Sequence, residues 1–296
     1  MKEDYSLANP KWSGRSKGTA FGYRTFIFLF KHVGIRAAYA LLHCVVPWYV
    51  ITARASNRAL RHFFARVRSR SPNVRLSRMR SYMFLGRSLI DRAAVRAGLA
   101  QRYTFTTNGR EHLRAMADAG QGGLVISAHV GNWELASHLL RENDLRLSVV
   151  MLDEEHEAIK RTLERNTEKP AAHIIALKED LSHLYRINAA LKEGRLVCFN
   201  GDRNLPGART LTGDLLGSPA EFPMGPFAVA FSMRVPVSFA FVVRTGPMAY
   251  GFSATSPIPV GTSVDDLFKR FVAELERTVI AHPSQWSNFF DFWNDG

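Results

Sequence analysis

His129 and Glu134 are the residues whose types and spacing point most directly to chemistry. They follow the apolar run 124–126, which is short and rich in branched side chains and therefore predicts a buried strand ending just before His129. Asn132 is a good N-cap, so we expect a helix to begin directly after it, with Glu134 in the first turn, where the helix N-terminus stabilises a carboxylate. The pair predicts a general base, His129, oriented by Glu134, that takes a proton from an attacking hydroxyl or amine.

A solvated loop pair is the alternative interpretation of His129 and Glu134. Their position favours the catalytic one, because open α/β sheets bind ligands where a strand ends and a helix begins. Gly131, between them, is expected to keep one side of the turn clear for a substrate.

A second polar group, Asn-Gly-Asp-Arg at 200–203, follows another predicted strand. If both strands belong to one parallel sheet, Asp202 and Arg203 share a crevice with His129. We expect Arg203 to bind a phosphate of the donor or acceptor, with Asp202 holding it in place. The alternative is a surface Asp-Arg pair that caps a turn.

The chain between and after these groups alternates between strand and helix patterns. Such alternation predicts an α/β fold with a largely parallel central sheet flanked by helices. Residues 204–223 are predicted to form a loop with a short strand at 210–216. The predicted strands are 146–152, 172–177, 196–200, 235–243 and 248–255, and the predicted helices are 154–166, 181–193, 227–233 and 264–281.

These blocks, in this order, resemble the bacterial lipid A biosynthesis acyltransferases, within the wider glycerolipid acyltransferase superfamily that carries His-x4-Asp/Glu. The resemblance rests on Ser-Ala-His-Val-Gly-Asn-Trp-Glu at 127–134, Asn-Gly-Asp-Arg at 200–203, Leu-Gly-Ser-Pro-Ala at 216–220 and Val-Pro at 235–236. It extends over most of the chain.

The resemblance implies an enzyme that moves a fatty acyl group from an acyl carrier protein or CoA thioester to a hydroxyl or amine of a lipid acceptor, at the cytosolic face of the inner membrane. It implies no metal and no bound cofactor. His129 and Glu134 would be catalytic, and the implied substrate-binding residues are Asn132, Asp202, Arg203 and Ser218.

Two departures from the family's pattern leave the acceptor open. The tail Pro-Ser-Gln-Trp at 283–286 is similar to the family's C-terminal Pro-x-Gln-x-x-Trp-like block. Lipid A enzymes usually continue with basic residues there, whereas this chain has Asp291 and aromatic residues. The Gly-Asp-Arg block also differs from the form in lipid A enzymes. An aminolipid, an aryl-polyene-type glycolipid or another lysolipid fits as well.

The N-terminal part, residues 1–53, is a polar tail followed by apolar and aromatic sequence. Its longest stretch without a charged residue is 37–53, at about the lower limit of 17 residues for crossing a bilayer. We expect a membrane-associated helical segment that lies on or in the bilayer, with a single span or buried core helices as alternatives. Residues 54–296 then form the acyltransferase domain.

Positive charge is concentrated between residues 54 and 114, which hold 15 arginines, no lysine, and only Asp91 and Glu111 as acids. The resulting net charge of +13 equals that of the whole chain. Beside an apolar segment this predicts attraction to an anionic membrane surface, an acidic carrier protein or the phosphates of an acceptor. Nucleic acid is not the expected partner, because no recognised binding motif accompanies the charge.

Several function classes are disfavoured by what the sequence lacks. Cys44 and Cys198 lie in apolar runs without metal-ligand spacing, and no GxSxG, GxGxxG, GxxxxGK[ST] or HExxH pattern occurs. A non-catalytic lipid-binding or scaffold protein remains the main rival, and a basic nucleic-acid-binding protein a weaker one.

Overall fold

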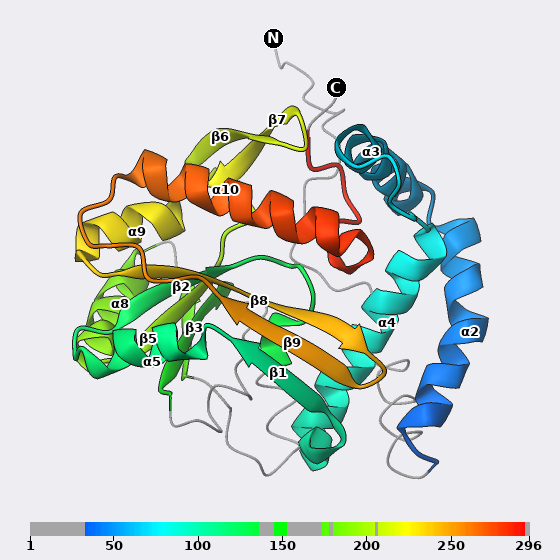
Figure 1. Ribbon diagram of the computed structural model, residues 1–296, viewed down its shortest axis with the longest axis horizontal. Coiled ribbons are helices and arrows are strands. Elements are labelled where there is room, and N and C mark those ends of the chain that lie inside the picture. The colour runs from blue at the N-terminus through cyan, green and yellow to red at the C-terminus, as the bar shows by residue number, and fades with distance from the viewer. Residues whose placement is uncertain (1–32, 136–144, 153–172, 178–179, 205–206, 294–296) are drawn as a thin grey trace.

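The computed structural model describes residues 33–135, 145–152, 173–177, 180–204 and 207–293. Its centre is a seven-stranded sheet in the order β1-β9-β8-β2-β5-β3-β4 (Figure 1). Every neighbouring pair is parallel except β8 with β9. The strands are β1 (Thr104–Asn108), β2 (Gly123–Ser127), β3 (Leu147–Leu152), β4 (His173–Leu177), β5 (Leu196–Asn200), β8 (Val237–Gly246) and β9 (Ala249–Ala254). The predicted α/β fold with a largely parallel sheet is confirmed.

Strand β2 lies in the middle of the sheet, between β8 and β5. Its residues Leu124, Val125 and Ile126 are all buried, at 0–3 % exposure, as expected of a parallel strand covered on both faces. Because β2 and β5 run parallel in register, with Ser127 opposite Asn200, the polar residues that follow the two strands emerge side by side.

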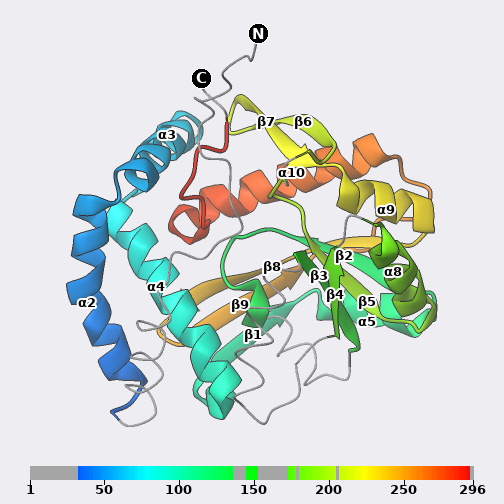
Figure 2. The same ribbon diagram turned by 180° about the vertical axis from the view of Figure 1, so that it is seen from behind.

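The helices after the arginine-rich region cover the sheet. Helices α5 (Arg110–Asp118) and α8 (Ser182–Lys192) pack against β5, and α9 (Gly225–Met233) packs against α10 (Val264–Ala281). Figures 1 and 2 show α10 lying between the sheet and a separate hairpin of β6 (Thr210–Leu215) and β7 (Ser218–Pro223). A strand was predicted near β6, but the residues of β7 were predicted to be loop, and β1 was not predicted. The predicted helix 154–166 lies outside the described residues.

Three N-terminal helices, α2 (Ile35–Thr52), α3 (Arg54–Arg70) and α4 (Arg78–Ala94), lie together on one side of the sheet (Figure 1). A stripe of α2, formed by Ile35, Ala38, Leu42 and Val46, is buried, and α2 packs on α4. The approach is close at Gly86, where a Cβ would lie 2.7 Å from the side chain of Leu42.

Other apolar side chains of α2 face outward. Trp48 is 67 % exposed and Ile51 76 %. Among the described residues, α2 is also the one helix long and apolar enough to cross a bilayer, by length and composition. The predicted N-terminal helical segment therefore combines a face packed on the domain with a second apolar face that is exposed, and the boundary at residue 53 stays a prediction.

A buried carboxyl, Asp91 of α4, joins three parts of the fold. It is fully buried and accepts hydrogen bonds from the hydroxyls of Tyr39 in α2, Tyr103 before β1 and Tyr250 in β9. Burial raises the pKa of Asp91, although the phenol donors and Arg244 oppose the shift. The cluster fixes α2 and α4 against the edge of the sheet.

Replacing Asp91 by alanine is expected to lower the free energy of unfolding by about 3 kcal/mol, because the buried hydroxyls of Tyr103 and Tyr250 and the half-buried hydroxyl of Tyr39 lose their acceptor, and each buried loss costs about 1–3 kcal/mol. Denaturant unfolding measures the change. The matched variant Asp118→Ala removes an exposed carboxylate of α5 and is expected to stay within about 0.5 kcal/mol of the wild type. Equal stabilities of the two variants would contradict the assigned role of the cluster.

Candidate active site

His129 lies two residues beyond β2 in a turn that the C-terminal segment holds from outside. The carbonyl of His129 accepts the N–H of Ser287 at 2.9 Å, and the N–H of Gly131 donates to the carbonyl of Gln285 at 2.8 Å. Val130 forms a bridge with Trp286. The imidazole is therefore positioned by two segments that lie more than 150 residues apart in sequence, and its side chain is 21 % exposed.

Gly131 is required here for packing and not for substrate access. Its φ of +74° is in the left-handed region, and a Cβ at this position would lie 1.8 Å from the carbonyl oxygen of Val242. The expectation that Gly131 leaves open space for a substrate was wrong, because the backbone of β8 fills that side.

The carboxylate on the ring of His129 is that of Asp202. Asp202 Oδ1 lies 2.7 Å from Nδ1 of His129, and Oδ2 accepts the backbone N–H of His129 and the indole N–H of Trp286, both at 3.0 Å. Donation of Nδ1–H to this carboxylate puts the imidazole lone pair on Nε2, which is the tautomer a general base needs.

Asp202 is an anion inside the protein. It is 1 % exposed, and burial by itself raises the pKa of a carboxyl group. The adjacent imidazole of His129, the guanidinium of Arg203 and the hydrogen bonds outweigh burial and hold the pKa of Asp202 well below its ordinary value. A fixed negative charge at this point stabilises the imidazolium that forms when His129 takes up a proton.

Glu134 is held by two arginines. One carboxylate oxygen accepts from Arg92 and the other from Arg96, which follow each other by one turn at the end of α4 and in the π-helical turn η1 (Val95–Leu99). Burial opposes ionisation, but the two guanidinium groups lower the pKa of Glu134. The sequence analysis gave Glu134 the role of orienting His129, whereas in the structure Asp202 occupies Nδ1. Arg92 and Arg96 were not among the predicted site residues.

Comparison with known proteins places the chain in a family. The model of the bacterial lipid A biosynthesis acyltransferase family matches residues 90–294, more than half of the chain. The chain belongs to this family. The matched region holds His129, Glu134, Asp202 and Trp286, and it begins near the end of α4, so α2 and α3 lie outside it.

Curated relatives include the phosphatidylinositol mannoside acyltransferases of two strains of Mycobacterium tuberculosis. Each is 23 % identical to this chain over 203 residues, a match that covers 66 % of this chain and 62 % of the relative. The chain therefore matches less than two thirds of the length of these relatives.

The other residues that the resemblance to this acyltransferase family implied have different surroundings. Asn132 is 2 % exposed, and its side-chain amide donates to the carbonyl of Ser88 in α4 at 3.2 Å. Arg203 donates to the carbonyl of Ser287 at 2.6 Å and lies over the ring of Phe290, 4.5 Å from its centroid. Both residues fix the turn and the C-terminal segment around His129, and their contact with substrate stays a prediction.

Ser218 lies apart from these residues. It begins β7, in the hairpin that packs on α10, and pairs with Leu215 across that hairpin. Its role in substrate binding stays a prediction. Phe222 of β7 and Phe227 of α9 are fully buried against Phe268 and Phe271 of α10 and belong to the core.

The C-terminal segment contributes Trp286 to the candidate site, a residue that was not predicted. Its ring is 1 % exposed and packs edge-on against Phe63 of α3 at 5.1 Å and Phe292 at 5.0 Å. This aromatic packing aims the indole N–H at Asp202. The only signal in the sequence was the family-like block around Gln285 and Trp286.

Neither a metal nor a cysteine is indicated at this site. Among the described residues, no group of three or more His, Cys, Asp or Glu side chains is placed to hold a metal ion. Burial raises the pKa of the Cys198 thiol to about 12, so this thiol is a poor nucleophile near neutral pH.

The lowered pKa of Asp202 predicts an acid-dependent contribution to stability. The stabilisation from its ionised form is present above the unfolded-state pKa of about 3.9 and is lost as pH falls through the lower folded-state pKa. Asp202→Asn is therefore expected to be less stable than the wild type at neutral pH, and the difference should narrow below about pH 4. Urea unfolding at a series of pH values measures it, and a difference independent of pH would contradict the lowered pKa.

Proposed function

We propose that this protein transfers a fatty acyl group from an acyl thioester to a hydroxyl or amine of a lipid acceptor. The observation that carries the proposal is the His129–Asp202 contact at the carboxyl end of the central strands, in a chain of the lipid A biosynthesis acyltransferase family. The donor is an acyl carrier protein or CoA thioester, and the reaction takes place at the cytosolic face of the inner membrane.

In the proposed mechanism the acceptor O–H or N–H gives its proton to Nε2 of His129. The acceptor oxygen or nitrogen forms a bond with the thioester carbonyl carbon, and the carbonyl oxygen becomes an oxyanion. When this tetrahedral intermediate collapses, the C–S bond breaks, the thiolate leaves, and the imidazolium returns its proton to the sulfur. Asp202 stabilises the imidazolium throughout.

The developing oxyanion is best stabilised by a cationic side chain. The backbone N–H groups of His129, Gly131 and Asn132 already donate to Asp202 or to backbone carbonyls. We assign this role to the pair Arg92 and Arg96, which Glu134 fixes beside the turn that carries His129. Glu134 then acts by holding these arginines, which accounts for its place in the motif.

A lipid acceptor is supported by the relatives and by the exposed apolar face of α2. The relatives named as phosphatidylinositol mannoside acyltransferases suggest a glycosylated or other polar lipid. Asn132, Arg203 and Ser218 remain proposed substrate-binding residues. The assay that follows distinguishes this enzyme from the alternative, a lipid-binding protein without turnover.

The test is acyl transfer by the purified full chain, incubated with a lipid extract from cells that lack the protein. Acyl carrier protein and CoA thioesters are supplied in separate reactions. One lipid class is expected to gain the mass of one acyl chain, with one free thiol released per transfer. Binding of the lipid extract without thiol release from either donor would overturn the proposed activity.

A further inference from the structure

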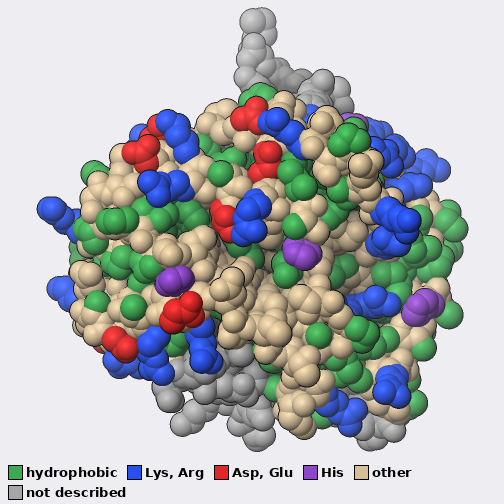
Figure 3. All heavy atoms as spheres, in the orientation of Figure 1, with side chains coloured by type: hydrophobic (Ala, Val, Ile, Leu, Met, Phe, Trp, Pro, Cys, Tyr) green, Lys and Arg blue, Asp and Glu red, His purple; other side chains and the backbone are tan. Residues whose placement is uncertain are grey.

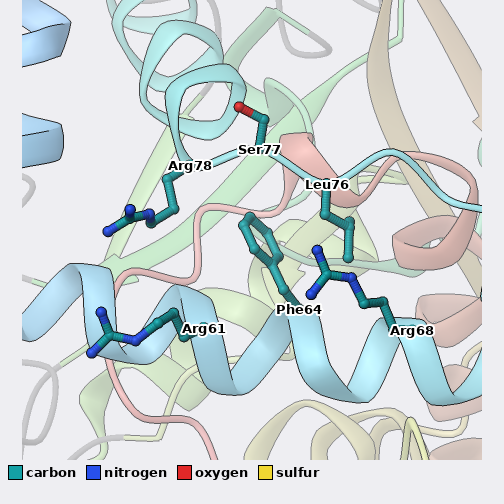
Figure 4. A pocket seen from close by; sticks show the side chains of 6 residues that line it. All are labelled: Arg61, Phe64, Arg68, Leu76, Ser77 and Arg78. Carbon is teal, nitrogen blue, oxygen red and sulfur yellow. The ribbon is translucent and has the colours of Figure 1, made fainter.

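A pocket outside the proposed reaction site lies between α3 and the start of α4. Its volume is about 440 Å³, and it is lined by Arg61, Phe64, Arg68, Leu76, Ser77 and Arg78 (Figure 4). The three residues of α3 follow each other at helical spacing and so share one face of that helix. Leu76, Ser77 and Arg78 line the other side, on the segment that leads into α4, and the side chains of Leu76 and Arg78 point toward α3.

The charge of this pocket is uncompensated. No acidic residue lines it, and within the part of the chain that the structure describes, none of Arg61, Arg68 and Arg78 forms an ion pair with a carboxylate. The neighbouring Arg70 differs, because it pairs with Asp214 and Glu276. Lys and Arg side chains gather over α3 on the surface in Figure 3. Three cations around one cavity repel each other, and a bound anion removes that repulsion.

Guanidinium groups favour phosphate as that anion. Arginine presents its N–H donors in a planar fork that binds two oxygens of a phosphate at once. Ser77 is the N-cap of α4, where its hydroxyl accepts the N–H of Arg80, and the first turn of α4 carries no acidic residue. A carboxylate also fits one such fork, but a phosphate offers more acceptor oxygens and more charge to three arginines, so the lining fits a phosphate better than a carboxylate or an uncharged sugar.

The surroundings of the pocket favour a phosphate carried by a lipid. Buried Phe64 and half-buried Leu76 give the cavity an apolar floor between the arginines. Tyr82, one turn after Arg78, stacks on Tyr49 of α2 with ring centroids 6.2 Å apart. Tyr49 is 41 % exposed, and Trp48 beside it 67 %. Exposed Trp and Tyr next to arginines are typical of a surface at the membrane–water interface.

We propose that this pocket binds the phosphate of an anionic phospholipid headgroup and holds the N-terminal helices on the bilayer. The site is separate from the proposed reaction centre. Arg78 and Arg92 lie on the same helix, 14 positions apart, or about 21 Å at 1.5 Å per residue. The proposal concerns membrane binding, and it stands whether or not the acyl transfer proposed above is observed.

The test compares two triple variants that remove the same charge. Arg61, Arg68 and Arg78 are changed to glutamine in the pocket variant, and the exposed Arg54, Arg58 and Arg80 of the same two helices are changed in the control. The full chain is sedimented with vesicles of phosphatidylcholine, with and without phosphatidylglycerol. Partitioning onto the anionic vesicles is expected to fall at least about tenfold further in the pocket variant, because it loses directed hydrogen bonds as well as charge.

Three results would overturn the proposal. An equal fall in both variants would mean a diffuse attraction of the basic surface. A second result is that inorganic phosphate stabilises the wild type but not the pocket variant, while the pocket variant still binds vesicles. That result would mean that the ligand is a soluble phosphate. Preferential loss of duplex DNA binding in the pocket variant would mean a nucleic acid. Thermal unfolding checks each variant, and the single change Arg78→Gln replaces the triple variant if that one does not fold.

Discussion

Replacing His129 by alanine is expected to lower the rate of acyl transfer by about 10²–10⁴-fold, the usual contribution of a general base. The acceptor hydroxyl or amine has no base to take its proton, so the attack on the thioester slows. Thiol release from the donor measures the rate. Binding of the acceptor lipid should change little, so the loss is expected in kcat.

The matched control for this variant is His43→Ala. His43 is an exposed histidine of α2, and its ring contacts the backbone carbonyl of Tyr39 one turn earlier. This control should keep the wild-type rate. If His129→Ala keeps it as well, His129 is not the base, and the contact between His129 and Asp202 serves the fold alone.

Replacing Asp202 by asparagine is expected to lower the rate by an amount of the same order, about 10²–10⁴-fold. The asparagine amide donates to Nδ1 of His129, which forces the ring proton onto Nε2 and removes the lone pair that acts as base. Because Asp202 acts through His129, the dependence of kcat/KM on pH should also change. The rise with pH that reports deprotonation of the base is expected to disappear.

Asp214→Asn is the control for that experiment. Asp214 is an exposed carboxylate that pairs with Arg70 near the hairpin of β6 and β7. It is expected to keep both the rate and the pH profile. A stable Asp202→Asn protein with the wild-type profile would contradict the orienting role of Asp202 and would return that role to Glu134.

Most of the sheet was predictable because its strands carry strong local patterns. Strands β2, β3 and β5 are continuous apolar runs between polar turns, and their alternation with helices implies parallel pairing. Strand β1 was missed because Thr104–Asn108 is largely polar and its burial pattern is mostly exposed. Strand β7 was missed because Ser218–Pro223 begins and ends with turn-forming residues.

Only those features of the site that depend on local sequence patterns were predictable. The strand ends placed His129 and Asp202 at the same edge, and the structure does bring them together. The choice of Asp202 instead of Glu134 at Nδ1 depends on side-chain directions across 73 residues, which no local pattern encodes. Arg92 and Arg96 were not predicted as site residues, because an arginine on an amphipathic helix usually faces solvent.

The most direct test of the account is comparative lipid mass spectrometry on cells that lack this protein, complemented with the wild type, His129→Ala or Asp202→Asn. We expect that one lipid class loses a single acyl chain in the deletion strain and that only the wild type restores it fully. Its mass identifies the acceptor and the chain length together. Full restoration by both variants, or no change in any lipid, would contradict the account.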